Sequence, residues 1–304
     1  MEEMLQKILD QNRYWIKYGE VPSYIPALAK ANPEDLGVSV VNMKGQIVTI
    51  GDCSTKFTMQ SISKPLALMQ AIMDSGPVEV FRKVGMEPTG DPFNSIIKLE
   101  TLKPSKPLNP MINAGAITTS SLINGSNSTE RIERLLELVR TLAGNNEIGI
   151  NEEIYHSEKE TADRNRALGY FMRDIGVLEG NVEDILDTYF RQCAIEVSCS
   201  DIANIAVGLA NKGNTLDGQE VVPADIVRIS NTFMVTCGMY NASGEFAIKA
   251  GLPAKSGVSG GIMALAPQKI GIGVYSPALD QRGNSIAGIH ILEDLSAWLD
   301  LSIF

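Results

Sequence analysis

The sequence predicts an α+β fold in which an antiparallel sheet is flanked by terminal helices and lies beside a central helical lobe. Strand patterns occur near both ends of the 304-residue chain, and helical patterns fill most of the stretch between them. Strands from the two ends can pair in one sheet, which the terminal helices then cover. We expect one domain over 1–304, with a sheet lobe at about 1–60 and 235–304 and a helical lobe at about 61–234.

The N-terminal segment predicts one amphipathic helix over residues 3–18 that ends near Gly19. Two strands are expected after it, over 36–41 and 46–50, joined by a turn at 42–45. The helical spacing rests on the apolar side chains of Met4, Leu5, Ile8, Leu9, Trp15 and Ile16.

Three stripes of apolar residues at helical spacing follow in the middle of the chain, within 132–142, 168–175 and 202–209. We expect the third helix to begin at Ser200-Asp201, because both residue types favour the N-cap position. Glycine-containing segments end the three helices, at Gly144, Gly176 and 211–213.

Near the C-terminus the pattern returns to strands, over 261–266 and 270–275, with a turn at 267–269 between them. A final helix is expected from about Ser285, because apolar residues recur on one side of it as far as Leu299.

Charge and composition exclude several classes of protein. The formal net charge of −10 argues against binding to nucleic acid or to an anionic membrane, which requires clustered Lys and Arg. No apolar run is long enough to span a membrane, and the N-terminus lacks the basic-then-apolar pattern of a secretory signal. We therefore expect a soluble, cytoplasmic protein with no membrane or nucleic-acid partner.

The cysteines and histidines argue against a metal site and against histidine-based catalysis. The four cysteines lack the spacing of metal ligands and are expected to be free thiols. His290 lies in a helical pattern and is expected to pack there, whereas His156 lies in a polar segment and is expected at the surface. A Ser-His-Asp enzyme, a Cys-His enzyme or a typical zinc hydrolase would need one of these two residues. We expect no metal and no cofactor.

The segment Ser61-Ile62-Ser63-Lys64 is the first candidate for chemistry. An apolar run follows it, and Pro65 is tolerated only near the start of a helix. Ser61 should therefore lie at or just before the first turn, with Lys64 on the same face. A lysine whose pKa is depressed by burial can accept the proton of a serine nucleophile, and the free N–H of Ser61 can help to hold an oxyanion.

The Ser-x-x-Lys pattern alone is weak, because it recurs by chance in a chain of this length. Ser95-Ile96-Ile97-Lys98 matches equally well, but it lies in a β-branched context with no predicted helix start. We interpret this second copy as structural.

Lys255-Ser256-Gly257 precedes a predicted strand and strengthens the case for Ser61. A Lys-Ser/Thr-Gly triplet accompanies Ser-x-x-Lys in β-lactamases and penicillin-binding proteins. By itself the triplet is better explained as a glycine-rich entry to a strand. The Ser-x-x-Lys motif at Ser61 and the triplet at Lys255 are unlikely to occur together in this order by chance.

Two polar clusters add candidate ligands. The segment 109–117 carries Asn109 and Asn113 among small residues, and its structural explanation is a turn before a buried helix. The run 157–165 is densely polar, and its structural explanation is a solvated helix face. If that run is one helix, Glu158 and Asn165 share a face and offer a carboxylate and an amide to an amino-acid ligand.

These segments together resemble the serine-dependent glutaminase family, whose catalytic domain is related to β-lactamases. The resemblance extends from about Val21 to Ser285, nearly the whole chain. It is carried by 21–26, 59–65, 109–117, 158–165, 237–240 and 251–261.

The resemblance implies hydrolysis of L-glutamine to L-glutamate and ammonia through a γ-glutamyl ester on Ser61, with Lys64 accepting its proton. Tyr240 would relay a proton to the departing ammonia, and the N–H groups of Ser61 and Val258 would form the oxyanion hole. Family substrate contacts fall on Tyr24, Ser61, Asn113, Glu158, Asn165, Tyr189, Tyr240 and Val258. Members of this family form dimers and tetramers, so a homo-oligomer is expected.

Two other functions stay open at this point. A penicillin-interacting serine hydrolase is opposed by the absence of Ser-Asp-Asn and Tyr-x-Asn, and by the absence of an export signal. A non-catalytic glutamine sensor is opposed by the intact Ser61, Lys64 and Tyr240, since a sensor needs no nucleophile.

Overall fold

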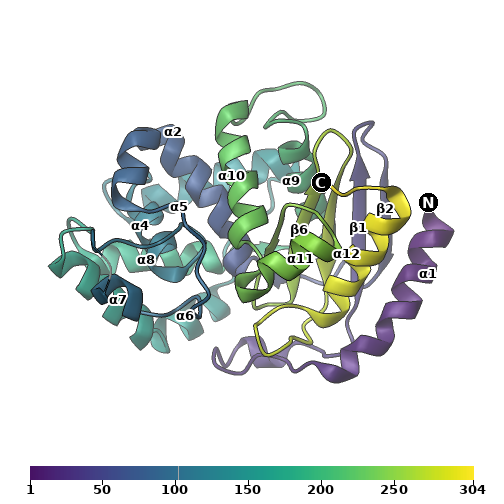
Figure 1. Ribbon diagram of the computed structural model, residues 1–304, viewed down its shortest axis with the longest axis horizontal. Helices are drawn as coiled ribbons and strands as arrows, with labels where there is room; N and C mark the ends of the chain where they lie inside the picture. The colour runs from purple at the N-terminus through teal and green to yellow at the C-terminus, as the bar shows by residue number, and fades with distance from the viewer. Residues whose placement is uncertain (102) are drawn as a thin grey trace.

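The computed structural model describes residues 1–101 and 103–304. Its main sheet has five antiparallel strands in the order β2-β1-β7-β6-β5 (Figure 1). The strands are β1 (Gly37–Asn42), β2 (Ile47–Gly51), β5 (Ala254–Ser256), β6 (Gly261–Ala266) and β7 (Ile270–Tyr275). The prediction that strands from both ends of the chain form one antiparallel sheet is confirmed.

The two faces of this sheet are covered by different helices. On one face, Val38 and Val40 of β1 join the core formed with α1 (Glu2–Asn12) and α12 (Ile286–Leu299), which are the predicted terminal helices. Val41, the next residue in the alternation, instead packs against α9 (Cys199–Ala210) on the other face. Although α9 falls within the range predicted for the helical lobe, it therefore covers the sheet.

Helix α9 lies unusually close to the sheet because β7 carries two glycines beneath it. A Cβ added to Gly271 would lie 2.1 Å from the backbone nitrogen of Val207, and one on Gly273 would lie 2.2 Å from the carbonyl oxygen of Cys199. No side chain fits at either position, so glycine is required for this helix to contact the strand.

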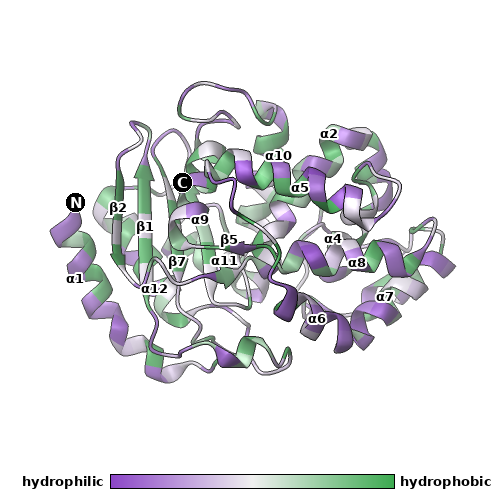
Figure 2. Ribbon diagram, turned by 180° about the vertical axis from the view of Figure 1, so that it is seen from behind, coloured by the Kyte–Doolittle hydropathy of each residue, from purple (hydrophilic) through white to green (hydrophobic). Residues whose placement is uncertain are grey.

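Most of the remaining helices form the group at the opposite end of the molecule from α1, whereas the helix at Ser243–Lys249 packs against α12 beside the sheet (Figure 1). Figure 2 shows hydrophobic colouring along the sheet strands and largely hydrophilic colouring on α6 and α7. The α-helices are α2 (Ser63–Lys83), α3 (Ile97–Thr101), α4 (Asn113–Ser121), α5 (Ser128–Ala143), α6 (Glu152–Glu160), α7 (Asp163–Asp174), α8 (Val182–Cys193), α10 (Ala224–Cys237) and α11 (Ser243–Lys249). Shorter elements are the 3₁₀ segments η1 (Arg13–Tyr18), η2 (Leu28–Lys30), η3 (Gln60–Ile62) and η4 (Tyr240–Ala242), and a small sheet of β3 (Phe57–Thr58) with β4 (Glu196–Val197).

Two predicted helix boundaries are wrong. The expected helix over 3–18 is α-helical only to Asn12 and then tightens into η1. The helix expected to begin at Ser200-Asp201 begins at Cys199, because Ser198 is its N-cap and forms a reciprocal capping box with Asp201.

Gly115 in α4 is expected to tolerate no side chain. A Cβ there would lie 1.9 Å from the carbonyl oxygen of Asn109, in the turn that precedes the helix. Gly115→Ala should therefore lower the free energy of unfolding by about 3 kcal/mol, as other overpacked core positions do. Urea denaturation would measure this change.

The matched control is Gly244→Ala, because Gly244 is an exposed position of α11 where a Cβ meets open space. Alanine there should stabilise the protein by about 0.5–1 kcal/mol through helix propensity. Equal midpoints for the two variants would contradict the close approach at Gly115.

Candidate active site

Ser61 lies in η3, immediately before the first turn of α2, as predicted. Its side chain lines a cavity of about 100 Å³. Lys64 lies on the first turn of α2 and is fully buried. Residues from several distant parts of the chain also line this cavity. They include Tyr24, Phe93, Asn113, Glu158, Asn165, Tyr189 and Val258. All the expected substrate contacts except Tyr240 therefore line one cavity.

Tyr240 lies directly beside this cavity. Its ring packs 5.0 Å from the ring of Phe93, which lines the cavity, and its hydroxyl donates a hydrogen bond to the carbonyl oxygen of Ser256 at 3.2 Å. Burial raises the pKa of Tyr240, and this outweighs a lowering by its hydrogen bond with Ser61. The phenol is therefore protonated at neutral pH and can donate a proton.

Lys64 is held by two acceptors. Its Nζ donates to the carbonyl oxygen of Met111 at 3.2 Å and to Oδ1 of Asn113 at 2.7 Å. Burial lowers the pKa of Lys64 to about 8. A neutral amine has two N–H donors and one lone pair, so these two acceptors leave the lone pair free to take a proton.

Lys255 lies in strand β5. The sequence predicted only the following strand, and not one that contains Lys255. Its Nζ donates to the carbonyl oxygens of Gly238 at 3.0 Å and Ser256 at 2.7 Å, and lies 4.4 Å from the centre of the Tyr240 ring. Burial and the neighbouring Lys64 lower its pKa well below the usual range. Lys255 and Tyr240 thus share one acceptor, which fixes the phenol beside Ser61.

Two residues at this site have left-handed backbone conformations without being glycine. Gln60, directly before Ser61, has φ 46°, and Tyr240 has φ 52°. Such residues cost free energy and cluster at functional sites. Within the described part of the chain, the N–H groups of Ser61 and Val258 donate to no other protein group, so both are available to an oxyanion.

Glu158 is the acidic group of the cavity, with 6% of its surface exposed. Burial raises its pKa to about 7, against lowering by hydrogen bonds from Gln60 and Cys193 and by the charge of Lys64. The Gln60 Nε2 atom lies 3.3 Å from a Glu158 carboxylate oxygen. A buried carboxylate poised in this way favours a cationic ligand, which would restore its charge.

The prediction that Glu158 and Asn165 share a face of one helix is wrong, because α6 ends at Glu160 and α7 begins at Asp163. The break nevertheless brings both side chains to the cavity. Asn165 accepts a hydrogen bond from Asn113 Nδ2 at 3.0 Å, so Asn113 connects it to Lys64.

The remaining candidates are Asn109, Tyr24 and the second Ser-x-x-Lys copy. Asn109 is a turn residue, since its Oδ1 accepts hydrogen bonds from the backbone N–H groups of Met111 and Ile112. Tyr24 stands at the rim of the cavity with 56% of its surface exposed. The second Ser-x-x-Lys copy does lie at a helix start, contrary to expectation, but Lys98 is exposed and neither Ser95 nor Lys98 lines the cavity.

Sequence reasoning missed Gln60, Phe93 and Cys193. Cys193 follows Tyr189 by one turn of α8 and hydrogen-bonds with both Tyr189 and Glu158, with its thiol pKa raised by burial. The spacing of four residues between Tyr189 and Cys193 was the available signal for a shared face. The position of Gln60 depends on its backbone conformation, for which the sequence offers no signal.

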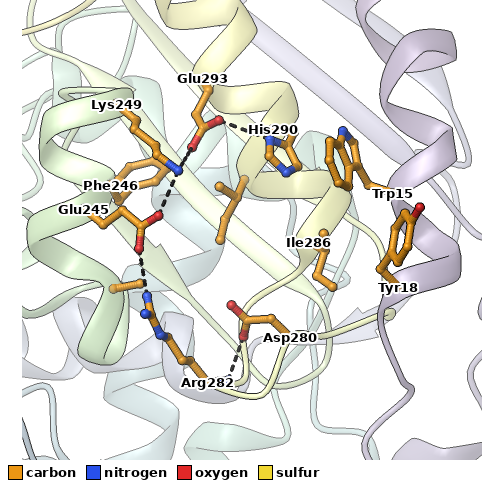
Figure 3. A pocket seen from close by; sticks show the side chains of 12 residues that line it. Trp15, Tyr18, Glu245, Phe246, Lys249, Asp280, Arg282, Ile286, His290 and Glu293 are labelled. Atoms are coloured by element: carbon orange, nitrogen blue, oxygen red, sulfur yellow. Dashed lines mark hydrogen bonds and ion pairs between the residues drawn. The ribbon is translucent and has the colours of Figure 1, made fainter.

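A separate pocket of about 400 Å³ lies between η1, α11 and α12 (Figure 3). Its charged groups pair with one another: Glu245 with Lys249 at 2.8 Å and with Arg282 at 3.0 Å. His290 stacks on Trp15 at 4.2 Å there, as expected for a packed helix residue, and His156 is exposed as predicted. Neither histidine lines the Ser61 cavity.

Residues 1–101 and 103–304 contain no cluster of three or more His, Cys, Asp or Glu arranged to hold a metal ion. In the same part of the chain, every helix is too short or too polar to cross a membrane.

The chain is similar to proteins of one family along its whole length. The family model described as Glutaminase matches residues 19–304. "Glutaminase 2" of Clostridium perfringens is 53% identical over all of both chains, and the glutaminase of Clostridioides difficile is 55% identical over 100% of this chain and 98% of its own.

Solved structures of glutaminases also superpose closely on this chain. A Bacillus glutaminase crystallised with 4.3 M NaCl superposes with a TM-score of 0.93 at 43% identity, over 100% of this chain and 99% of its own. A probable glutaminase from Bacillus subtilis in complex with 6-diazo-5-oxo-L-norleucine superposes with a TM-score of 0.91 at 40% identity, over 100% of this chain and 96% of its own. The predicted fold, α+β and β-lactamase-like, is thus confirmed, and the chain belongs to the glutaminase family.

Proposed function

We propose that this enzyme hydrolyses L-glutamine to L-glutamate and ammonia through a γ-glutamyl ester on Ser61. The observation that carries the proposal is a serine at a helix start, in an amino-acid-sized cavity, beside a buried lysine with a pKa of about 8. A solved glutaminase from Bacillus subtilis, 39% identical, forms a covalent complex with 5-oxo-L-norleucine after reaction with 6-diazo-5-oxo-L-norleucine. That reaction of a relative supports a covalent mechanism with a nucleophile supplied by the protein.

In the first half-reaction, the lone pair of Lys64 accepts the Ser61 proton as Oγ attacks the γ-carbonyl carbon. The N–H groups of Ser61 and Val258 stabilise the oxyanion. The carbon–nitrogen bond then breaks while Tyr240 gives its proton to the departing nitrogen, and the Lys64 ammonium reprotonates the phenolate. The products are ammonia and the γ-glutamyl ester, with Lys64 neutral again.

In the second half-reaction, water loses a proton to Lys64 and its oxygen attacks the ester carbon. The bond to Ser61 Oγ breaks, and the serine oxygen takes the proton back from the lysine. Glutamate leaves, and the site returns to its starting state. Lys64 therefore acts as base and then acid in each half.

The α-ammonium and α-carboxylate of glutamine are expected to bind at the opposite end of the cavity. Glu158 is the anionic group there and suits the ammonium. The amides of Asn113 and Asn165 and the phenols of Tyr24 and Tyr189 suit the carboxylate, because each offers an N–H or O–H donor.

The direct test is the release of ammonia and glutamate from glutamine by the purified protein. Stoichiometric release of both supports the proposal, whereas no release overturns it and favours a glutamine sensor. Acylation by a chromogenic cephalosporin would instead favour the penicillin-interacting alternative.

Glu158→Gln should raise KM for glutamine strongly. Loss of a charge-paired ammonium contact costs on the order of 2–5 kcal/mol, or a factor of about 30 or more. The wild-type KM should also rise as the pH falls below about 7, because protonation of Glu158 removes its charge. Steady-state kinetics between pH 6 and 8 measures both effects.

The matched control is Glu160→Gln, two residues later on the exposed side of the same helix. Its KM should equal that of the wild type. A KM for Glu158→Gln that stays within twofold of the control would show that the ammonium binds elsewhere.

We further propose that the chain works as one domain, in the cytoplasm, as a dimer or tetramer. The thiols support a reducing compartment, since Cys53, Cys193, Cys199 and Cys237 are all free. Sedimentation of the purified protein tests the assembly, and a monomer at micromolar concentration would contradict it.

A further inference from the structure

Helix α6 carries Glu158 on its last turn, and most of the helix surface is polar. Glu152, Glu153 and His156 are exposed, so solvent covers one side of it. Tyr155 and Lys159 lie four residues apart on another face and point toward α8. The orientation of Glu158 therefore depends on what holds those two side chains.

Both side chains are held by one carboxylate on α8. Asp187 accepts hydrogen bonds from the Tyr155 hydroxyl and from Lys159 Nζ, the latter at 2.5 Å. It also accepts from Arg191 Nε at 2.9 Å and from Ser128 Oγ of α5 at 2.9 Å. The side chain of Asp187 is only 14% exposed, and three helices thus meet at it.

The contacts around Asp187 reinforce one another. Lys159 Nζ also donates to the Tyr155 hydroxyl at 2.9 Å, and the Arg191 guanidinium lies 4.3 Å from the centre of the Tyr155 ring. Although burial raises the pKa of Asp187, the hydrogen bonds from Lys159, Tyr155 and Arg191 hold it well below its usual range. The group is therefore ionised at every pH at which the enzyme would work.

We propose that Asp187 is a positioning residue for substrate affinity: by fixing Tyr155 and Lys159, it sets the rotation of α6 that points Glu158 into the Ser61 cavity. Glu158 immediately precedes Lys159, so a turn of the helix about its axis moves both side chains together. The inference rests on the proposed role of Glu158 in binding the substrate ammonium. Asp187 itself does not line the cavity.

The chain offers a matched control one turn earlier on α8. Asp184 pairs with Arg131 at 2.5 Å and accepts the N–H of Ser128 at 2.9 Å, so it binds α5 as Asp187 does. Its hydrogen bonds reach no residue of α6. Asp184→Asn therefore removes a comparable charge from the same helix without releasing Glu158.

The experiment compares Asp187→Asn, Asp184→Asn and Tyr155→Phe with the wild type. It measures kcat and KM for glutamine, Kd for L-glutamate by calorimetry, and Tm. We expect Asp187→Asn to raise KM and Kd by about tenfold or more while kcat changes by less than about threefold, since affinity and not the nucleophile is disturbed. Asp184→Asn should lower Tm with KM and Kd unchanged.

Tyr155→Phe decides the matter if Asp187→Asn does not fold, because it keeps the buried ring and removes only the hydroxyl. It should raise KM and Kd in the same direction by a smaller factor. Equal KM and Kd values in all the variants that fold, or a loss confined to kcat, overturn the inference. A wild type that releases no ammonia would instead overturn the proposed function, so the two failures are distinguishable.

Discussion

Ser61→Ala is expected to reduce ammonia release from glutamine by at least about 10⁴-fold, the scale seen when a catalytic serine is removed. The variant lacks the oxygen that forms the ester, and the neighbouring serine does not replace it, because Ser63 is fully buried and donates to the carbonyl oxygen of Gln60 at 2.7 Å. Glutamate should still bind, because its charged groups contact other residues of the cavity. A coupled ammonia assay and calorimetry together measure loss of turnover with retention of affinity.

The control for this variant is Ser95→Ala, which removes the serine of the second Ser-x-x-Lys copy. It should keep wild-type activity, because Ser95 does not line the cavity. Mass spectrometry after treatment with 6-diazo-5-oxo-L-norleucine should find an adduct on the wild type and on Ser95→Ala only. Equal turnover by Ser61→Ala and the wild type would refute the nucleophile assignment.

Lys64→Met is expected to lower kcat by about 10²–10⁴-fold, the usual contribution of a general base. Methionine approximates the length of the lysine stem, so the buried volume is nearly kept while the proton acceptor is lost. In the wild type at saturating glutamine, where the effect of Glu158 on KM is removed, kcat should rise with pH toward about 8, because the pKa of Lys64 is depressed and the neutral amine accumulates above that value. This rise should be absent in the residual activity of the variant.

Lys98→Met is the matched control, since Lys98 is exposed in the second copy of the motif. It should leave both kcat and the pH profile unchanged. A profile for Lys64→Met that still rises toward pH 8 would assign the proton acceptor to another group.

The sequence predicted the elements that burial marks most strongly. The central strands of the main sheet lie between two helical layers, so they form short apolar runs bounded by turn residues, as at Val40 and Val41 of β1. Boundaries failed where local hydrogen bonding decides: the capping box of Ser198 moved the start of α9, and a break divided 157–165 into two helices.

The candidate site was predictable to the extent that side-chain chemistry marks it. Ser61, Lys64 and Glu158 stand out because a reactive or charged group occurs in a helical context. Gln60 and Cys193 did not, because the backbone turn at Gln60 and the distance between α6 and α8 are properties of tertiary packing. The four-residue spacing of Tyr189 and Cys193 marks a shared face of α8, but no spacing in the chain records the approach of α8 to α6 or the turn at Gln60.

The left-handed conformations of Gln60 and Tyr240 have a consequence for the evolution of this enzyme. Each such residue costs about 1–2 kcal/mol relative to glycine, and together they represent a sizeable part of the 5–15 kcal/mol that keeps a typical protein folded. A screen of random variants for heat tolerance alone should therefore enrich glycine at position 60, whereas at position 240 the loss of the buried ring would cost more than the backbone strain that glycine relieves. Only selection that also demands ammonia release would keep the glutamine.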